Sequence, residues 1–239
     1  IDRPEFLMDC ARKMNKLLTA VFAVSVACVT AASSAQEIKG DAAAGATKVA
    51  LCMGCHGIPE YKASFPEVYE VPKIAGQNAQ YIEAALKEYK SGDRKFPTMR
   101  AVASTLSDQD IADVAAYYST LGVVPGHTVP DEPSIKPNAQ VAAILAKANC
   151  AACHGANFDK PIAPNYPKLA GQHASYLLVA LKEYKAGSDN PHFGRGNPIM
   201  GAMAKQFSDA DLKAVAEYVS SLPGDVKTVA IPRLDPRFK

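Results

Sequence analysis

The sequence predicts an all-α protein made of two copies of one small helical unit. Apolar residues recur at the spacing of an α-helix, and no stretch alternates convincingly as a β-strand does. The second half repeats the landmarks of the first half in the same order. Each half also contains one cysteine–histidine hexapeptide, CMGCHG at 52–57 and CAACHG at 150–155, so the repeat extends to residues that carry chemistry.

The composition of the 239-residue chain is that of an ordinary globular protein, with 48% hydrophobic and 21% charged residues. The length suits one large domain or two small ones. The formal net charge of +2 gives no reason to expect a nucleic acid partner.

The N-terminal segment has the pattern of a secretory signal peptide. Residues 14–35 read MNKLLTAVFAVSVACVTAASSA, in which a lysine precedes an apolar run and then small residues. The run is shorter than the about 20 residues that span a membrane. We therefore expect residues 1–35 to be a leader outside the mature fold, and the protein to be exported to the periplasm. The alternatives are a retained signal anchor and lipid attachment at Cys28.

The repeat sets the predicted domain organisation. PKIAGQNAQYIEAALKEYKSG at 72–92 matches PKLAGQHASYLLVALKEYKAG at 167–187, and a second pair of matching segments follows each of these. We expect a first domain at 36–122 and a second domain with a C-terminal tail at 139–239. The proline-rich stretch between them, 123–138, is predicted to be a semi-rigid linker.

A central helix is predicted in each unit from apolar residues at positions i, i+3, i+4 and i+7. In the first unit these residues are Ile82, Ala85, Leu86 and Tyr89, the second unit repeats the pattern from residue 177, and a glycine ends each helix.

Further helices are expected from residues that cap helix N-termini. Asp41 and Asn138 precede a first helix in each unit, and Ser107 and Ser208 precede a closing helix with an aspartate three residues later. Each unit then has three or four short helices with little apolar material, so its core is undersized unless a further group fills it.

Three chemistries use the C-x-x-C spacing. A zinc site takes thiolates and imidazoles in a tetrahedron, a redox dithiol needs a strand–helix context, and covalent haem takes two thiols and the adjacent histidine. The histidine directly after the second cysteine is present in both copies. It favours two covalently attached haem c groups over zinc sites or redox dithiols. The residues expected to hold them are Cys52, Cys55, Cys150 and Cys153 as thioethers, and His56 and His154 as iron ligands.

The sixth iron ligands are predicted to be Met99 and Met200. Both lie in R-x-x-P-x-M, and they are the only methionines after the leader that align between the halves. A lone methionine usually packs in a core, but the paired position before a capped helix favours ligation. The remaining histidines, His127, His173 and His192, are expected to be exposed.

The motifs C-x-x-C-H, P-K-[IL]-A-G-Q, R-x-x-P-x-M and [LF]-S-D-x-D-[IL] occur in this order twice. In this combination the chain resembles the dihaem cytochrome c4 family. The resemblance implies two tandem class I cytochrome c domains related by a pseudo-two-fold axis, each wrapped around one covalent haem whose propionate edge faces the interface. It also implies that the carbonyls of Pro72 and Pro167 accept hydrogen bonds from the ligating imidazoles. Arg94 and Arg195, which open the methionine motifs, are expected next to the ligands.

One segment departs from the family pattern. GIPEYKASFPEVYEV at 57–71 replaces a shorter, glycine-rich loop after the first hexapeptide. This departure affects the expected surroundings of the first haem and not its ligands.

Histidine–methionine ligation fills both axial positions, so the predicted activity is outer-sphere electron transfer, and the protein is not expected to be an enzyme. The resemblance implies a periplasmic, often membrane-associated carrier. Its expected redox partners are an upstream quinol-oxidising complex or dehydrogenase and a downstream terminal oxidase. The alternative is a dihaem electron-accepting subunit of a flavoprotein dehydrogenase of the sulfide dehydrogenase type. Lysines that form either a docking rim or an ordinary solvated face are Lys73, Lys87, Lys90 and Lys95.

Overall fold

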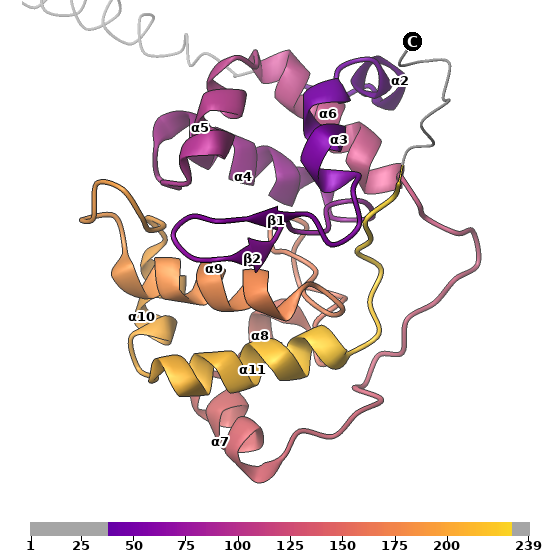
Figure 1. Cartoon of the computed structure of the whole chain (residues 1–239). Helices are drawn as coiled ribbons and strands as arrows, with labels where there is room; N and C mark the ends of the chain where they lie inside the picture. Colours follow the sequence, from indigo (N-terminus) through magenta and orange to yellow (C-terminus); the bar gives the residue numbers. More distant parts are fainter. Residues whose placement is uncertain (1–37, 231–239) are drawn as a thin grey trace, which may run out of the picture. The chain divides into compact units, whose positions relative to one another are not determined.

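The structure is a computed structural model that describes residues 38–230, and the predicted leader lies outside the described residues (Figure 1). The elements of the first half are α2 (Ala42–Ala46), α3 (Ala50–His56), β1 (Lys62–Ala63), β2 (Tyr69–Glu70), α4 (Ala79–Ser91), α5 (Pro97–Ser104) and α6 (Asp108–Thr120). Those of the second half are α7 (Ala139–Ala148), α8 (Ala151–His154), α9 (Ala174–Ala186), α10 (Pro198–Ala204) and α11 (Asp209–Ser221).

The predicted helix starts are confirmed by their hydrogen bonds. The side chains of Asp41 and Asn138 accept hydrogen bonds from the first turns of α2 and α7. Ser107 and Ser208 form complete capping boxes at the starts of α6 and α11. A local sequence signal therefore fixes where four of the helices begin.

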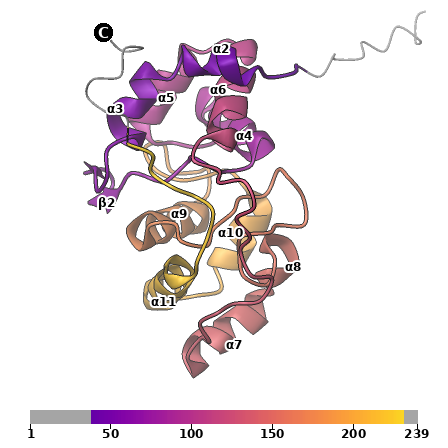
Figure 2. The same ribbon diagram turned by 90° about the vertical axis from the view of Figure 1, so that its right-hand side faces the viewer.

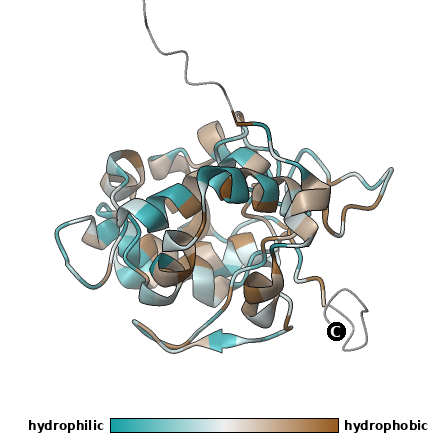
Figure 3. Cartoon of the chain, turned by 90° about the horizontal axis from the view of Figure 1, so that it is seen from above, coloured by the Kyte–Doolittle hydropathy of each residue, from teal (hydrophilic) through white to brown (hydrophobic). Residues whose placement is uncertain are grey.

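The helices pack in the same pattern in both halves. In the first half α6 packs on α2 and α4, and α4 also packs on α5. In the second half α11 packs on α7 and α9, and α9 packs on α10. Both hydrophobic and hydrophilic residues occur along these helices (Figure 3). In an amphipathic helix the apolar residues recur every three to four positions and form one face. Each half buries its own hydrophobic cluster, so the repeat in sequence is also a repeat in structure.

The inserted segment 57–71 adds a short β-hairpin to the mostly helical fold. Lys62 pairs with Glu70 and Ala63 with Tyr69 in a short antiparallel hairpin of β1 and β2. Two residues on each strand are too few to produce a readable alternation of apolar and polar residues. Figure 1 shows this hairpin lying along α9 of the second half, with which β2 is in contact.

The linker and the C-terminal segment both run between the two halves (Figure 2). In the linker, the carbonyl of Pro130 accepts a hydrogen bond from the side chain of Asn157. In the C-terminal segment, Lys227 exchanges two backbone hydrogen bonds with Ala75 of the first half. Val229 packs against the core of the first half. The tail, assigned above to the second domain, thus also packs on the first.

Among residues 38–230 no helix has both the length and the apolar character needed to cross a membrane.

Candidate functional site

The first hexapeptide forms most of α3, which fixes the placement of its side chains. Cys52 and Cys55 are three residues apart in the helix, so they lie on one face. Both side chains are half-buried. His56 is the last residue of the helix, and its Nδ1 lies 2.8 Å from the carbonyl oxygen of Pro72. The contact expected from the resemblance is therefore present in the first half.

This contact determines the form of the His56 ring. Because a carbonyl oxygen can only accept, Nδ1 carries the hydrogen and donates it to Pro72. Burial lowers the pKa of His56, although the hydrogen bond to Pro72 offsets part of that fall. The ring is then neutral near pH 7, with the lone pair of Nε2 free. A neutral imidazole held in one tautomer is the form that binds a metal.

The four predicted haem-binding residues of the first half meet at one cavity. The cavity has a volume of about 370 Å³ and is lined by Cys52, Cys55, His56 and Met99, among other residues. Met99 reaches it from α5, where a proline at the first helical position starts the helix just before the methionine. The two thiols and the imidazole thus face the same space as a thioether that is distant from them in sequence.

The walls of this cavity fit a large apolar ring. The four apolar residues that predicted the central helix, now part of α4, all line the cavity. They are Ile82, Ala85, Leu86 and Tyr89. Side chains that would normally fill a core face this space instead, which accounts for the undersized core expected from the sequence. The cavity extends to the second half, where Tyr176 forms part of its wall.

The second half places its predicted residues in the equivalent positions. Cys150 precedes α8, Cys153 lies within it, and His154 ends it. Nδ1 of the buried His154 lies 3.3 Å from the carbonyl oxygen of Pro167, and burial lowers the pKa of this histidine. Met200 is the third residue of α10, as Met99 is the third residue of α5. Its backbone N–H donates to the Asn197 side chain, which caps the helix.

Arg94 and Arg195 are both buried, with 3% of each residue exposed. Arg94 donates through Nε to Glu88 at 2.5 Å and lines the first cavity, whereas Arg195 donates through Nε to Glu183 at 2.5 Å. Their guanidinium groups stack on tyrosines of α4 and α9, at 5.2 to 5.5 Å from the ring centroids. The backbones of the two arginines also pair with each other, so they join the two halves.

Sequence reasoning missed the residues that connect the halves. The Gln172 side chain accepts from the backbone N–H of Lys73 at 2.9 Å and donates to the carbonyl of the same residue at 2.8 Å. Gln77 makes the reciprocal pair of bonds to Lys168, both at 2.9 Å. Both glutamines end the repeated P-K-[IL]-A-G-Q motif. The signal was therefore visible as a repeat, but its role was not.

The backbone conformation at the glycine of this motif favours glycine in both halves. Gly76 and Gly171 have φ angles of +78° and +71°, which other residues rarely adopt. A Cβ on Gly76 would lie 2.7 Å from the backbone oxygen of Asp225 in the C-terminal segment.

Two surface expectations are corrected by the structure. The ammonium group of Lys73 donates to the carbonyl of Gly171 at 2.6 Å, so Lys73 is not part of a free docking rim. His173 is not exposed, because it lies against the hairpin with its Nδ1 3.2 Å from a carboxylate oxygen of Glu70. His127 and His192 are exposed, as expected.

Comparison with known proteins agrees with this geometry. The cytochrome c family profile matches residues 42–122 and 139–223. Cytochrome c4 of Azotobacter vinelandii is 31% identical over 196 residues, which cover 77% of this chain and 90% of that protein. Cytochrome c4 of Pseudomonas aeruginosa is 30% identical over 87% of this chain and 100% of that protein. The chain belongs to the dihaem cytochrome c4 family.

A solved structure and a further relative in sequence show the same likeness. Reduced recombinant cytochrome c4 from Pseudomonas stutzeri superposes with a TM-score of 0.54 and 28% identity, covering 77% of this chain and 100% of that one. A thiosulfate dehydrogenase electron acceptor of Stutzerimonas stutzeri is 30% identical over 86% of this chain and 94% of that protein. This member of the cytochrome c4 family thus consists of two cytochrome c domains in tandem with two covalently bound haem c groups. It is a dihaem electron-transfer cytochrome.

Proposed function

We propose that the two haem sites of this cytochrome are held by equivalent residues of the two halves. The thioethers form at Cys52 and Cys55 in the first site and at Cys150 and Cys153 in the second. The axial ligands are His56 with Met99, and His154 with Met200. The observation that carries this assignment is the first cavity, which is lined by both cysteines, the histidine and the methionine of that half.

A covalently bound haem supplies a one-electron iron centre. The residues of the chain determine how that centre is used. His56 is oriented by its bond to Pro72, so the ring presents the unprotonated Nε2. With Met99 as the second axial ligand, no coordination position is left for a substrate, and thioether ligation favours the ferrous state. The arrangement supports outer-sphere electron transfer.

The function we propose is that of an exported electron carrier in the periplasm. It takes electrons from a quinol-oxidising complex or a dehydrogenase and delivers them to a terminal oxidase. The signal peptide pattern of residues 14–35 supports export. The match to cytochromes c4 over most of the chain supports the role of carrier. Peripheral membrane association is part of the proposal, because the family resemblance implies it.

A second candidate is an electron acceptor that works as the partner of one dehydrogenase. The names of two relatives favour it, since thiosulfate dehydrogenase electron acceptors of Stutzerimonas stutzeri and Thiomonas intermedia are 30% and 28% identical to this chain. A flavoprotein of the sulfide dehydrogenase type is the other dehydrogenase to consider.

The ligand assignment is tested by replacing each methionine with histidine in the holoprotein. Met99→His and Met200→His should each lower the midpoint potential of one haem only, because imidazole does not raise the potential as a thioether does. Met203→Leu, three residues after Met200 in α10, is the matched control and should change neither potential. Unchanged potentials in either histidine variant would refute that ligand.

The choice between carrier and dedicated partner is tested by native purification from the membrane and soluble fractions of the source cells. A visible spectrum with a haem-to-chain count of two and no flavin, together with rapid oxidation by an oxidase-containing membrane, supports the carrier. Stoichiometric co-purification with a flavoprotein or a thiosulfate dehydrogenase contradicts it and favours the second candidate.

A further inference from the structure

One buried hydroxyl group has no partner within the described part of the chain. Tyr118 in α6 is 1% exposed, and its hydroxyl oxygen makes no hydrogen bond to any residue of 38–230. It is the one buried side-chain nitrogen or oxygen in those residues of which this is true. Leaving a buried hydroxyl unpaired costs free energy, so native proteins rarely do it. The hydroxyl is therefore expected to bond to a group that the polypeptide itself does not supply.

The position of Tyr118 identifies that group. Tyr118 lines the same cavity as Cys52, His56 and Met99. Its ring is held edge-on against Tyr117, with 5.5 Å between the ring centroids. The cavity wall that contains Tyr118 also contains Cys52, which packs against the same hydrophobic cluster as the tyrosine. A hydroxyl at this place faces the point at which the first haem is attached.

The second half lacks this hydroxyl. In the repeat, AAYYSTLG at 115–122 aligns with AEYVSSLP at 216–223, so Val219 stands where the first half has Tyr118. Val219 is 3% exposed and packs in the core of the second half, as its counterpart packs in the first. The two halves therefore differ in polarity at one matched buried position of their closing helices.

We propose that the Tyr118 hydroxyl donates a hydrogen bond to the haem group attached at Cys52, and that this bond raises the reduction potential of the first site relative to the second. Reduction adds one electron from the upstream donor to the iron and forms or breaks no bond. The positive end of the O–H dipole points towards the site, so it stabilises the reduced form more than the oxidised form. Tyr118 is thus a tuning residue that biases electrons towards the first half. The inference rests on the proposed attachment at Cys52.

The test is the Tyr118→Phe variant of the holoprotein, studied by a spectroelectrochemical titration that resolves both haems. Phenylalanine keeps the ring and removes only the hydroxyl. The midpoint potential of the first site is identified as the one that Met99→His lowers. Tyr118→Phe should lower this potential, seen as one of the two titration waves, and leave the other potential unchanged. The expected change in electron partition between the sites is about fivefold, or about 40 mV for one electron. Tyr117→Phe is the matched control, since Tyr117 is adjacent but does not line the cavity, and should shift neither wave.

Urea unfolding of the same holoproteins gives a second reading. Tyr118→Phe should be less stable than the wild type when the hydroxyl is paired with the haem group, and equally or more stable when it is not. Two unmoved waves, or two waves that move together, overturn the inference while leaving the proposed function intact. A wild-type haem count below two per chain instead overturns the proposed attachment, and the inference with it.

Discussion

The two glutamines that join the halves allow a quantitative test of the interface. Gln172→Ala removes both hydrogen bonds between its side chain and the backbone of Lys73, which are 2.8 and 2.9 Å long. Gln172 is only 4% exposed, so water does not readily replace the lost side chain. At about 0.5–1.5 kcal/mol for each net hydrogen bond, the variant should lose about 1–3 kcal/mol of unfolding free energy.

The chain supplies two matched comparisons for this variant. Gln77→Ala removes the reciprocal pair of bonds to Lys168 and is also buried, so it should cost a similar amount. Gln140 is exposed and its side chain donates to the exposed Asp211 carboxylate, so Gln140→Ala should change stability by less than about 0.5 kcal/mol. The assay is urea unfolding of the holoproteins followed by far-ultraviolet circular dichroism. Losses in both interface variants no larger than that of Gln140→Ala would refute the role of the glutamines.

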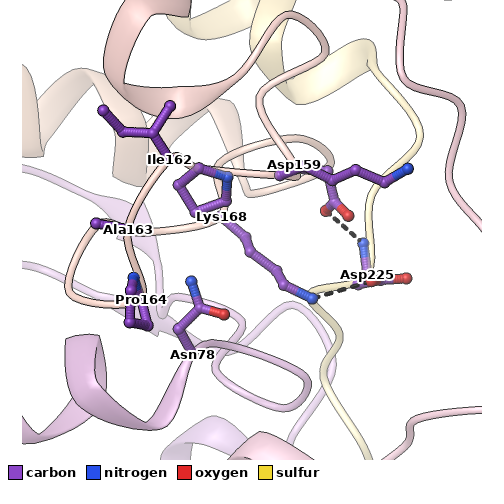
Figure 4. Close-up of a pocket in the computed structure, with 9 residues that line it drawn as sticks. Asn78, Asp159, Ile162, Ala163, Pro164, Lys168 and Asp225 are labelled. Carbon is purple, nitrogen blue, oxygen red and sulfur yellow. Dashed lines mark hydrogen bonds and ion pairs between the residues drawn. The ribbon is translucent and has the colours of Figure 1, made fainter.

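Two further predictions concern buried charges. Glu183→Ala leaves Arg195 buried without its partner and should cost about 3–5 kcal/mol of unfolding free energy. Glu88→Ala should cost less, because 35% of the Glu88 side chain is exposed. Equal losses of unfolding free energy in urea would contradict this account. Asp159 is 1% exposed and accepts a hydrogen bond from the backbone of Asp225 (Figure 4). Burial raises the pKa of Asp159, so the stability that its protonated form provides is present below its unfolded pKa of about 3.9 and is lost as pH rises through the folded pKa. Asp159→Asn, which stays neutral, should therefore gain stability relative to the wild type as pH rises from the unfolded pKa of about 3.9 to the raised folded pKa, and a difference that is constant with pH would refute this.

The fold was predictable where the signals are local. Helix periodicity located α4 and α9, and N-cap residues such as Ser107 and Ser208 located α2, α6, α7 and α11, because a capping box involves residues only three positions apart. The short helices α3, α5, α8 and α10 were not predicted. The hairpin of β1 and β2 was not predictable, since two paired residues on each strand leave no periodic pattern. Its place along α9 depends on contacts between distant residues, such as the hydrogen bond from the backbone of Glu70 to Ser175.

The candidate site was predictable because the repeat supplied a second copy of every signal. Alignment of the halves singled out Met99, and the structure places it at the same cavity as His56. The role of Gln172 was not predictable, because its partners lie in the other half and depend on how the two units meet. Tyr118 lies on the buried face of α6, but helical periodicity carries no information about the direction of a hydroxyl group.

The central claim, that this is a dihaem carrier whose axial positions are all filled, is tested most directly by a reductive titration under nitrogen followed by exposure to carbon monoxide. The account predicts that two covalent haems take up two electrons per chain, and that the reduced spectrum does not change when carbon monoxide is added. Uptake of one electron per chain, or rapid binding of carbon monoxide to the reduced native protein, would contradict it.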